Sequence, residues 1–165
     1  MAQAYPSITV DGLDLDSDAI NAARRNAERA GVADRVRFSV TDAADLGGAG
    51  GYDLVMIFEA LHDVSRPVDA LSAARQMLSQ DGTVLVVDGL VADELTVPAT
   101  PLERFAYGWS VVSCLPGAMG DPQTAATGAV MRPSVLRQYA LQAGFGEVEV
   151  LPIHTGSWRF YRLLQ

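Results

Sequence analysis

Apolar residues along the chain fall into short runs that alternate with amphipathic stretches. Tyr52–Phe58 and residues 83–88 are almost continuously apolar, which is the pattern of strands buried on both faces. Residues 8–13 predict a shorter buried strand that ends in carboxylates. Val36–Val40 alternates apolar and polar residues, which is typical of a strand with one face less covered, near the edge of a sheet.

Amphipathic stretches between these strands follow a helical period. The first begins at Ser17, which can cap it, and Gly31 ends it. Prolines open two further helices at Pro67 and Pro133, a position that proline favours, and the earlier of these is expected to run to residues 81–82. Strands that alternate with helices in this way predict an α/β fold with a mostly parallel sheet and right-handed crossovers.

The second half of the chain departs from this simple alternation. Residues 147–152 and 157–164 alternate apolar and polar side chains and predict an antiparallel pair at the end of the sheet. Residues 89–132 are too long for a simple connection, and we interpret them as an inserted lid or substrate wall. Within this segment residues 102–114 predict a helix, which residues 115–117 (Leu-Pro-Gly) are expected to break.

Composition narrows the possible classes of protein. A length of 165 residues predicts one domain, residues 1–165, with enough chain for a real core. The net charge of −8 argues against nucleic acid or an anionic membrane surface as partner. Cys114 is the single cysteine, which excludes a disulfide framework and a multi-cysteine metal centre. We therefore predict no metal site, a buried apolar role for Cys114 and a cytoplasmic location, because the sequence shows neither a signal peptide nor a membrane-spanning run.

Asp14 stands at the carboxyl end of the first predicted strand, where ligands bind in open α/β sheets. A carboxylate there can accept hydrogen bonds from both hydroxyls of a ribose. In nucleotide-binding folds a glycine-rich turn precedes this acid by about 20 residues, but only residues 1–7 precede the strand here. The glycine-rich run at residues 47–51 does not replace that turn. It leads into a strand and lacks the Lys-Ser/Thr of a phosphate loop, so we interpret it as a plain loop.

Several of these segments, taken in order, resemble class I S-adenosylmethionine (SAM)-dependent methyltransferases. The resemblance implies a Rossmann-like sheet of seven strands whose last strand inserts antiparallel beside the fifth. The family's first, central strand and its glycine-rich loop have no counterpart in this sequence, so the chain resembles a carboxyl-terminal fragment or one half of a split enzyme. The missing strand would be replaced by a companion chain, by a homodimer exchanging strands, or by direct pairing of residues 8–13 with residues 54–58. The segments that carry the resemblance are residues 12–16 (GLDLD), 40–43 (VTDA), 52–55 (YDLV), 58–63 (FEALHD), 78–82 and 143–145 (AGF).

The resemblance also implies a cofactor, SAM, and residues that would bind its adenosine. Asp14 corresponds to the acid that binds the ribose hydroxyls, and Leu15 would pack against the adenine ring. Asp42 corresponds to the acid that accepts from the adenine amine, with the backbone amide of Ala43 meeting a ring nitrogen. The alternatives are a helix-capping acid for Asp14, ordinary core for Leu15 and a turn-capping acid for Asp42.

Chemically active side chains follow the strand that ends at Phe58. The resemblance places Phe58 and Glu59 where cofactor and substrate meet, although Glu59 could equally be an exposed loop acid. A histidine has a pKa near 6.5 and can take a proton from a hydroxyl at neutral pH. Plant-type O-methyltransferases carry a His-Asp pair after the same strand, with the histidine as base. His62 and Asp63 are therefore our catalytic candidates, with the adjacent Asp63 carboxylate expected to orient the histidine. A structural histidine is the alternative.

The function that the resemblance implies is methyl transfer from SAM to a small molecule. A hydroxyl oxygen is the expected acceptor, with nitrogen or carbon as further options. Two other functions stay open on the residues alone. A non-catalytic methyltransferase-like subunit would explain the missing glycine-rich loop, while Asp14, Asp42 and His62 oppose it. A nicotinamide dehydrogenase shares the acid after the strand but is disfavoured by the terminal antiparallel pair.

Overall fold

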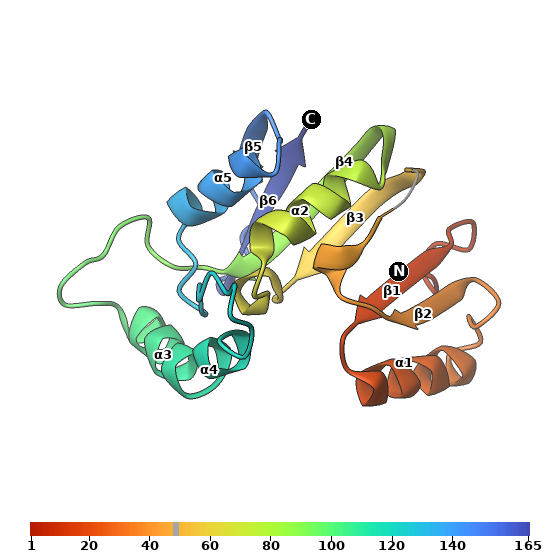
Figure 1. The fold of residues 1–165 in the computed structure, drawn as a ribbon, viewed down its shortest axis with the longest axis horizontal. Coiled ribbons are helices and arrows are strands. Elements are labelled where there is room, and N and C mark those ends of the chain that lie inside the picture. Colours follow the sequence, from red (N-terminus) through yellow and green to blue (C-terminus); the bar gives the residue numbers. More distant parts are fainter. Residues whose placement is uncertain (48–49) are drawn as a thin grey trace. The chain divides into compact units, whose positions relative to one another are not determined.

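The computed structural model describes residues 1–47 and 50–165, and these form two compact units, Met1–Leu46 and Gly47–Gln165 (Figure 1). Each unit contains a strand–helix–strand repeat with parallel strands, as the sequence predicts. The plain-loop interpretation of residues 47–51 includes residues 48 and 49, which lie outside the described residues. The assignment of residues 1–165 to a single domain stays a prediction.

The first unit is a two-stranded parallel sheet with one helix. Its strands align Val10 with Val36 and Asp14 with Val40, so both strands end at the same edge. Val10, Val36 and Phe38 pack against the small cluster of buried residues that includes Ala27 of the helix. The elements are β1 (Val10–Asp14), α1 (Ser17–Arg29), β2 (Val36–Val40) and the short 3-10 helix η1 (Ala43–Asp45).

Two local predictions for this unit need correction. Asp16, rather than Ser17, is the N-cap of α1, because its side chain accepts a hydrogen bond of 2.7 Å from the Asp18 amide. The strand predicted as buried is partly exposed, since its sheet has only two strands, and Leu13 retains 38% of its accessible surface. Gly31 adopts a φ of 67° just beyond the helix and ends it as predicted.

The second unit is a four-stranded mixed sheet in the order β3-β4-β6-β5. Strands β3 and β4 are parallel, and β6 lies between β4 and β5, antiparallel to both. The antiparallel strands at the carboxyl terminus are therefore confirmed. In Figure 1, α2 and α5 lie over one face of this sheet. The elements are β3 (Tyr52–Phe58), α2 (Pro67–Gln76), β4 (Leu78–Gly89), α5 (Pro133–Gln142), β5 (Glu147–Val150) and β6 (Trp158–Leu164).

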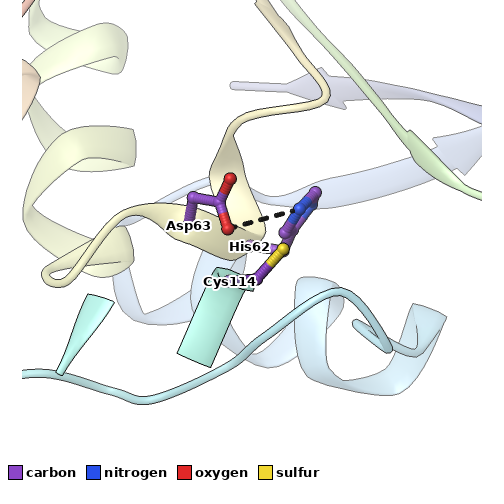
Figure 2. A group of neighbouring side chains, drawn as sticks. All are labelled: His62, Asp63 and Cys114. Carbon is purple, nitrogen blue, oxygen red and sulfur yellow. Dashed lines mark ion pairs between the residues drawn. The ribbon is translucent and has the colours of Figure 1, made fainter. Parts of the chain in front are cut away.

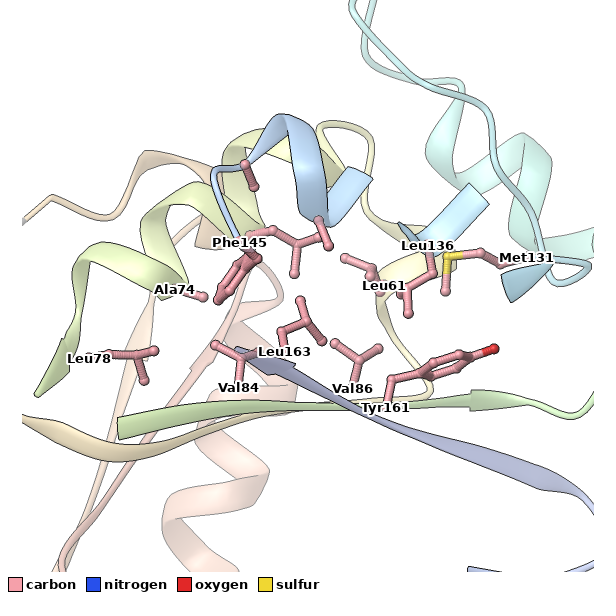
Figure 3. Close-up of a cluster of buried hydrophobic side chains, with 13 residues drawn as sticks. Leu61, Ala74, Leu78, Val84, Val86, Met131, Leu136, Phe145, Tyr161 and Leu163 are labelled. Atoms are coloured by element: carbon pink, nitrogen blue, oxygen red, sulfur yellow. The ribbon is translucent and has the colours of Figure 1, made fainter. Parts of the chain in front are cut away.

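The main hydrophobic core fills the space between this sheet and the two helices (Figure 3). Val84 and Val86 contribute from β4, Leu163 from β6 and Leu136 from α5, and none of the four retains measurable exposure. Leu61 belongs to the same cluster, although it lies in the turn after β3. Burial of a leucine contributes about 1.5–3 kcal/mol, so the core holds the turn that carries the next residue, His62.

Strand β3 is less buried than its apolar sequence predicts. Its side chains alternate, and Leu54, Met56 and Phe58 keep between 39% and 50% of their accessible surface. The reason is topological: β3 is the edge strand of its sheet, and α2 and α5 cover only the other face. Direct pairing of the first strand with β3 is not observed among the described residues, where β1 and β3 belong to separate sheets.

Helix α2 also ends earlier than predicted. Its last residue is Gln76, and Leu78 already pairs with Tyr52 as the first residue of β4. The amide of Tyr52 donates to the carbonyl of Met77, the C-cap residue. Leu78 is buried as a strand residue, and it would also fall on the apolar face of a longer helix. The helical period in the sequence therefore extends through it.

The segment 89–132 holds three consecutive helical pieces near the carboxyl ends of β3 and β4 (Figure 1). The predicted break at residues 115–117 is wrong, because the helical path continues through a π-helical turn into α4. Proline is tolerated there, in the first turn of a helix. No helix among the described residues has the length and apolarity needed to cross a membrane. The pieces are α3 (Pro101–Trp109), the π-helix η3 (Ser110–Cys114) and α4 (Leu115–Ala118).

Candidate active site

His62 lies in a single 3-10 turn, η2 (Leu61–Asp63), that follows β3. Its neighbour Leu61 is fully buried in the core, and His62 itself is only 6% exposed. The backbone carbonyl of His62 accepts a hydrogen bond of 3.1 Å from the Gly128 amide. Gly128 has a φ of 70°, and an added Cβ would overlap the Ser110 hydroxyl. The turn is therefore held from both sides.

Asp88, at the end of β4, is the principal partner of the His62 ring. Its Oδ1 lies 2.8 Å from Nδ1 of His62 and also accepts the Gly89 amide at 2.8 Å. Because a carboxylate oxygen accepts, Nδ1 carries the proton and donates, which leaves the lone pair of the neutral ring on Nε2. Both side chains are buried, at 8% and 3% exposure.

Sequence reasoning missed the role of Asp88 and expected the adjacent Asp63 to orient the histidine. The signal was present, because Asp88 is the first polar residue after the apolar run of β4, at the sheet edge where the predicted histidine also lies. Asp63 is near the other ring nitrogen instead. Its Oδ1 is 3.5 Å from Nε2 of His62, and its side chain is half exposed.

Cys114 brings a third donor group to the same place. Figure 2 shows its sulfur beside the His62 ring, with the Asp63 carboxylate close by. One donor atom from each of His62, Asp63 and Cys114 lies within 4.8 Å of the others. Cys114 is buried, as predicted, and burial together with Asp63 raises the pKa of its thiol to about 11. The thiol is therefore protonated at neutral pH.

Two opposing effects set the pKa of His62. Burial alone lowers it, because a charged ring loses hydration. The hydrogen bond and charge of Asp88, followed by the charges of Asp63 and Glu59, outweigh this effect and raise the pKa above its ordinary value. The ring is consequently a stronger base than a free imidazole.

Glu59 follows β3 directly and has a backbone conformation that is uncommon for a residue with a side chain. Its φ is 50°, which costs on the order of 1–2 kcal/mol. Strain of this kind concentrates at functional sites. Partial burial and the charge of Asp88 raise the pKa of the Glu59 carboxyl. The charge of His62 and a hydrogen bond with Trp158 lower this pKa but do not cancel the increase. The Phe58 ring meets Trp158 edge to face, with ring centres 5.7 Å apart.

These groups line a cavity of about 360 Å³, a size suited to a small ligand. Its lining has a polar part and an apolar wall. The wall comes mainly from α3, where the rings of Phe105 and Trp109 stack with centres 6.2 Å apart. The polar lining side chains include Glu59, His62, Asp63 and Asp88. The structure thus brings three of the predicted residues, Glu59, His62 and Asp63, to one cavity.

Apart from Phe58, which lies in β3, the remaining predicted residues form a group of their own in the first unit. Asp14 is the last residue of β1, and Asp42 comes shortly after the end of the neighbouring parallel strand β2. The amide of Thr41 donates to the carbonyl of Asp14 at 2.9 Å. Oδ1 of Asp14 accepts from the Asp16 amide, and Oδ1 of Asp42 accepts from the Ala44 amide. Each acid therefore also serves as a local cap.

The adenosine roles of these residues stay predictions. Leu15 is 67% exposed, so its side chain is available to an apolar ring rather than buried in the core. Ala43 begins the 3-10 turn η1. The acids, the exposed leucine and the backbone amide lie at one edge of the two-stranded sheet.

Comparison with known proteins identifies the class. A family model for the methyltransferase domain matches residues 1–84 of the 165, and the chain belongs to this family. This confirms the resemblance inferred from the sequence.

Solved structures confirm the Rossmann-like fold over 99% of the chain. A provisionally assigned O-methyltransferase from Nostoc punctiforme is 22% identical, with a TM-score of 0.76. An O-methyltransferase family protein from Burkholderia thailandensis is 18% identical, with a TM-score of 0.71. An O-methyltransferase family 2 protein from Planctomyces limnophilus, in complex with apigenin, is 20% identical, with a TM-score of 0.70. The chain spans 45–47% of the length of these three proteins.

Proposed function

We propose that this chain carries the acceptor-activating half of a SAM-dependent O-methyltransferase that acts on a small molecule. The observation that carries the proposal is the buried pair of His62 and Asp88, with an Nδ1–Oδ1 distance of 2.8 Å. This pair directs the basic Nε2 atom toward a cavity that has an apolar wall. The similarity to small-molecule O-methyltransferases supports the same conclusion.

In the proposed reaction, the acceptor hydroxyl lies in the cavity against the apolar wall of α3. His62 accepts the hydroxyl proton at Nε2, and the resulting imidazolium donates from Nδ1 to the carboxylate of Asp88. The negative charge of the carboxylate would compensate the new positive charge. Asp63, near Nε2, stabilises the protonated ring further. The rings of Phe105 and Trp109 line the cavity and would offer an apolar surface to the acceptor.

SAM, when bound, would supply an electrophilic methyl group on a sulfonium. The residues of the first unit fit the adenosine part of this cofactor. Asp14 uses one hydrogen bond for capping, and a carboxylate can accept several more, so the ribose hydroxyls remain possible partners. We assign the adenine face to Leu15 and the adenine edge to Asp42 and Ala43, and assign Phe58 and Glu59 to the mouth of the site. A homodimer or companion chain would contribute to this binding.

A non-catalytic, methyltransferase-like subunit is the second candidate. The observation in its favour is that Asp14 and Asp42 both cap backbone amides of their own turns, which explains their presence without a cofactor. In that case the cavity beside His62 would hold no acceptor.

Calorimetry of the full chain with SAM and with S-adenosylhomocysteine distinguishes the candidates. We expect binding that weakens in Asp14→Asn and is unchanged in Asp34→Asn, a matched exposed acid in the same unit. Absence of binding by the unsubstituted chain would favour the subunit. Where binding is found, transfer of a labelled methyl group to a panel of small phenols tests the base. His62→Gln should reduce transfer by about 10²–10⁴-fold while leaving SAM binding intact.

A further inference from the structure

We propose that His62, Asp63 and Cys114 form a Zn²⁺ site, whose occupation withdraws His62 from its role as a base. The inference goes beyond the proposed function, and only its regulatory consequence rests on that function. It also departs from the sequence expectation that the chain has no metal site. The main observation behind the proposal is that an imidazole, a carboxylate and a thiol line the same cavity (Figure 2). One donor atom from each lies within 4.8 Å of the others.

The spacing of these donors fits a tetrahedral ion. Zinc bonds of about 2.0–2.3 Å to nitrogen, oxygen and sulfur place neighbouring ligand atoms about 3.3–3.6 Å apart at a tetrahedral angle. The distance from His62 Nε2 to Asp63 Oδ1 is already 3.5 Å. The Cys114 sulfur lies within 4.8 Å of the other two donors, and a rotation about its χ1 torsion can adjust its position. The fourth position would hold water or a ligand from the cavity.

The surroundings of the His62 ring match those of a metal-bound histidine. Such histidines donate their other ring nitrogen to a carboxylate or carbonyl, which fixes the tautomer and aims the lone pair at the ion. Asp88 does this for His62, because its Oδ1 accepts from Nδ1 at 2.8 Å. The lone pair is then on Nε2, the ring nitrogen that Asp63 Oδ1 approaches to 3.5 Å.

An independent observation points to a cation at this place. Asp88 is 2% exposed and lines the cavity, and its second oxygen, Oδ2, has no hydrogen-bond partner among the described residues. A buried carboxylate with an unpartnered oxygen is costly. Together with Asp63 and Glu59 it makes the cavity electronegative, and a divalent ion would offset that charge.

The ligand chemistry selects Zn²⁺ over harder ions. Zn²⁺ binds nitrogen, sulfur and carboxylate oxygen donors, whereas Mg²⁺ and Ca²⁺ prefer oxygen alone. On binding, the Cys114 thiol gives its proton to solvent and forms the zinc–sulfur bond as a thiolate. With the Asp63 carboxylate, the two negative ligands then balance the charge of the ion.

Occupation of this site and base catalysis exclude each other. The ion and the acceptor proton need the same Nε2 lone pair of His62. A zinc-loaded chain would therefore transfer no methyl group to a hydroxyl until a chelator removed the ion, so the site would act as a metal-sensitive brake on the proposed activity.

Cobalt(II) provides a test that needs no enzymatic activity. Co²⁺ substitutes for Zn²⁺ and gives a thiolate-to-metal charge-transfer band, and Cys114 is the single cysteine of the chain. We expect the full chain, titrated with Co²⁺ under reducing conditions, to develop this band with one-to-one stoichiometry. Zn²⁺ should abolish the band by displacement. Asp88→Asn should weaken Co²⁺ binding by about 10–100-fold, as second-sphere substitutions do.

Matched variants locate the site. Cys114→Ser should lose the charge-transfer band and His62→Gln should weaken metal binding, with circular dichroism confirming the fold of each. His154→Gln is the control, because His154 is the other histidine and is exposed. The proposal is overturned if the unsubstituted chain gives no thiolate band at millimolar Co²⁺, or if His154→Gln abolishes it.

The metal test and the function test fail separately. A band in a chain that binds no SAM would support the zinc site and reject the proposed function. Absence of a band in a chain that transfers methyl groups would reject the zinc site and support the proposed function. Where both hold, Zn²⁺ should inhibit transfer and a chelator should restore it.

Discussion

Replacing Asp88 with asparagine tests the interaction on which the candidate site depends. The substitution keeps the size and planarity of the side chain, removes its charge and leaves one oxygen that can still accept a hydrogen bond. Asp88 Oδ1 and His62 Nδ1 are 2.8 Å apart, with side chains 3% and 8% exposed. Solvent therefore screens the pair little, and the loss of charge should lower the pKa of His62.

The size of this decrease follows from the strength of the bond. A hydrogen bond to a charged group is worth about 1.5–3 kcal/mol, and one pKa unit corresponds to about 1.36 kcal/mol. Asp88→Asn should therefore lower the pKa of His62 by about one to two units. Asp63→Asn is the matched control. Its oxygen lies 3.5 Å from Nε2 and its side chain is half exposed, so screening should limit its effect to less than about one unit.

Nuclear magnetic resonance titration of the imidazole signals measures both effects. The chain has two histidines, and the exposed His154 serves as an internal reference that neither substitution should move. Because the folded pKa of His62 is raised, its protonation stabilises the fold. This stabilisation is complete below the unfolded pKa of about 6.5 and is lost as the pH rises through the higher folded value. An unchanged or increased pKa of His62 in Asp88→Asn would refute the reasoning.

Three further predictions concern stability and reactivity. Glu103 is 1% exposed and pairs with the guanidinium of Arg132 at 2.6 Å. Glu103→Ala should therefore lower the free energy of unfolding, measured in urea, by about 3–5 kcal/mol. A loss below about 1 kcal/mol would contradict a buried pair. Gly128→Ala should destabilise more than Gly31→Ala in the same assay. Both have positive φ, but only at Gly128 would the new methyl meet other atoms, and equal losses would refute this. Cys114, with a thiol pKa of about 11, should react with iodoacetamide at pH 8 more slowly than free cysteine and become reactive on unfolding in urea; fast labelling of the folded chain would contradict its burial.

The sequence was sufficient for the parallel strand–helix–strand units and the terminal antiparallel strands, because each is encoded by local periodicity. It failed where tertiary context decides. The apolar run of β3 predicted burial on both faces, but α2 and α5 cover only one face of its sheet, and the side chains on the other face are exposed. The predicted helix end at residues 81–82 was wrong because Leu78 is buried equally well as a strand residue.

The candidate site was predictable only in part for a related reason. His62 and Asp63 were recognised because they are adjacent and follow a strand. The pairing of His62 with Asp88 joins residues 26 positions apart, and the approach of Cys114 joins residues farther apart still. Such contacts depend on which strands neighbour each other in the sheet, and local spacing carries no information about that.

Arg132 ties the start, the middle and the end of the segment 89–132 together. Its guanidinium donates to the carbonyl of Ala92, to the carboxylate of Glu103 and to the hydroxyl of Tyr107. Movement of this segment away from the cavity about a hinge would break these bonds and expose the buried charge of Glu103. We therefore expect molecules to enter the cavity by rotation of individual rings such as Trp109, in nanoseconds rather than milliseconds. The size of an entering molecule should then be limited by the fixed opening of the cavity. Replacing a single aromatic residue there with alanine should widen that opening.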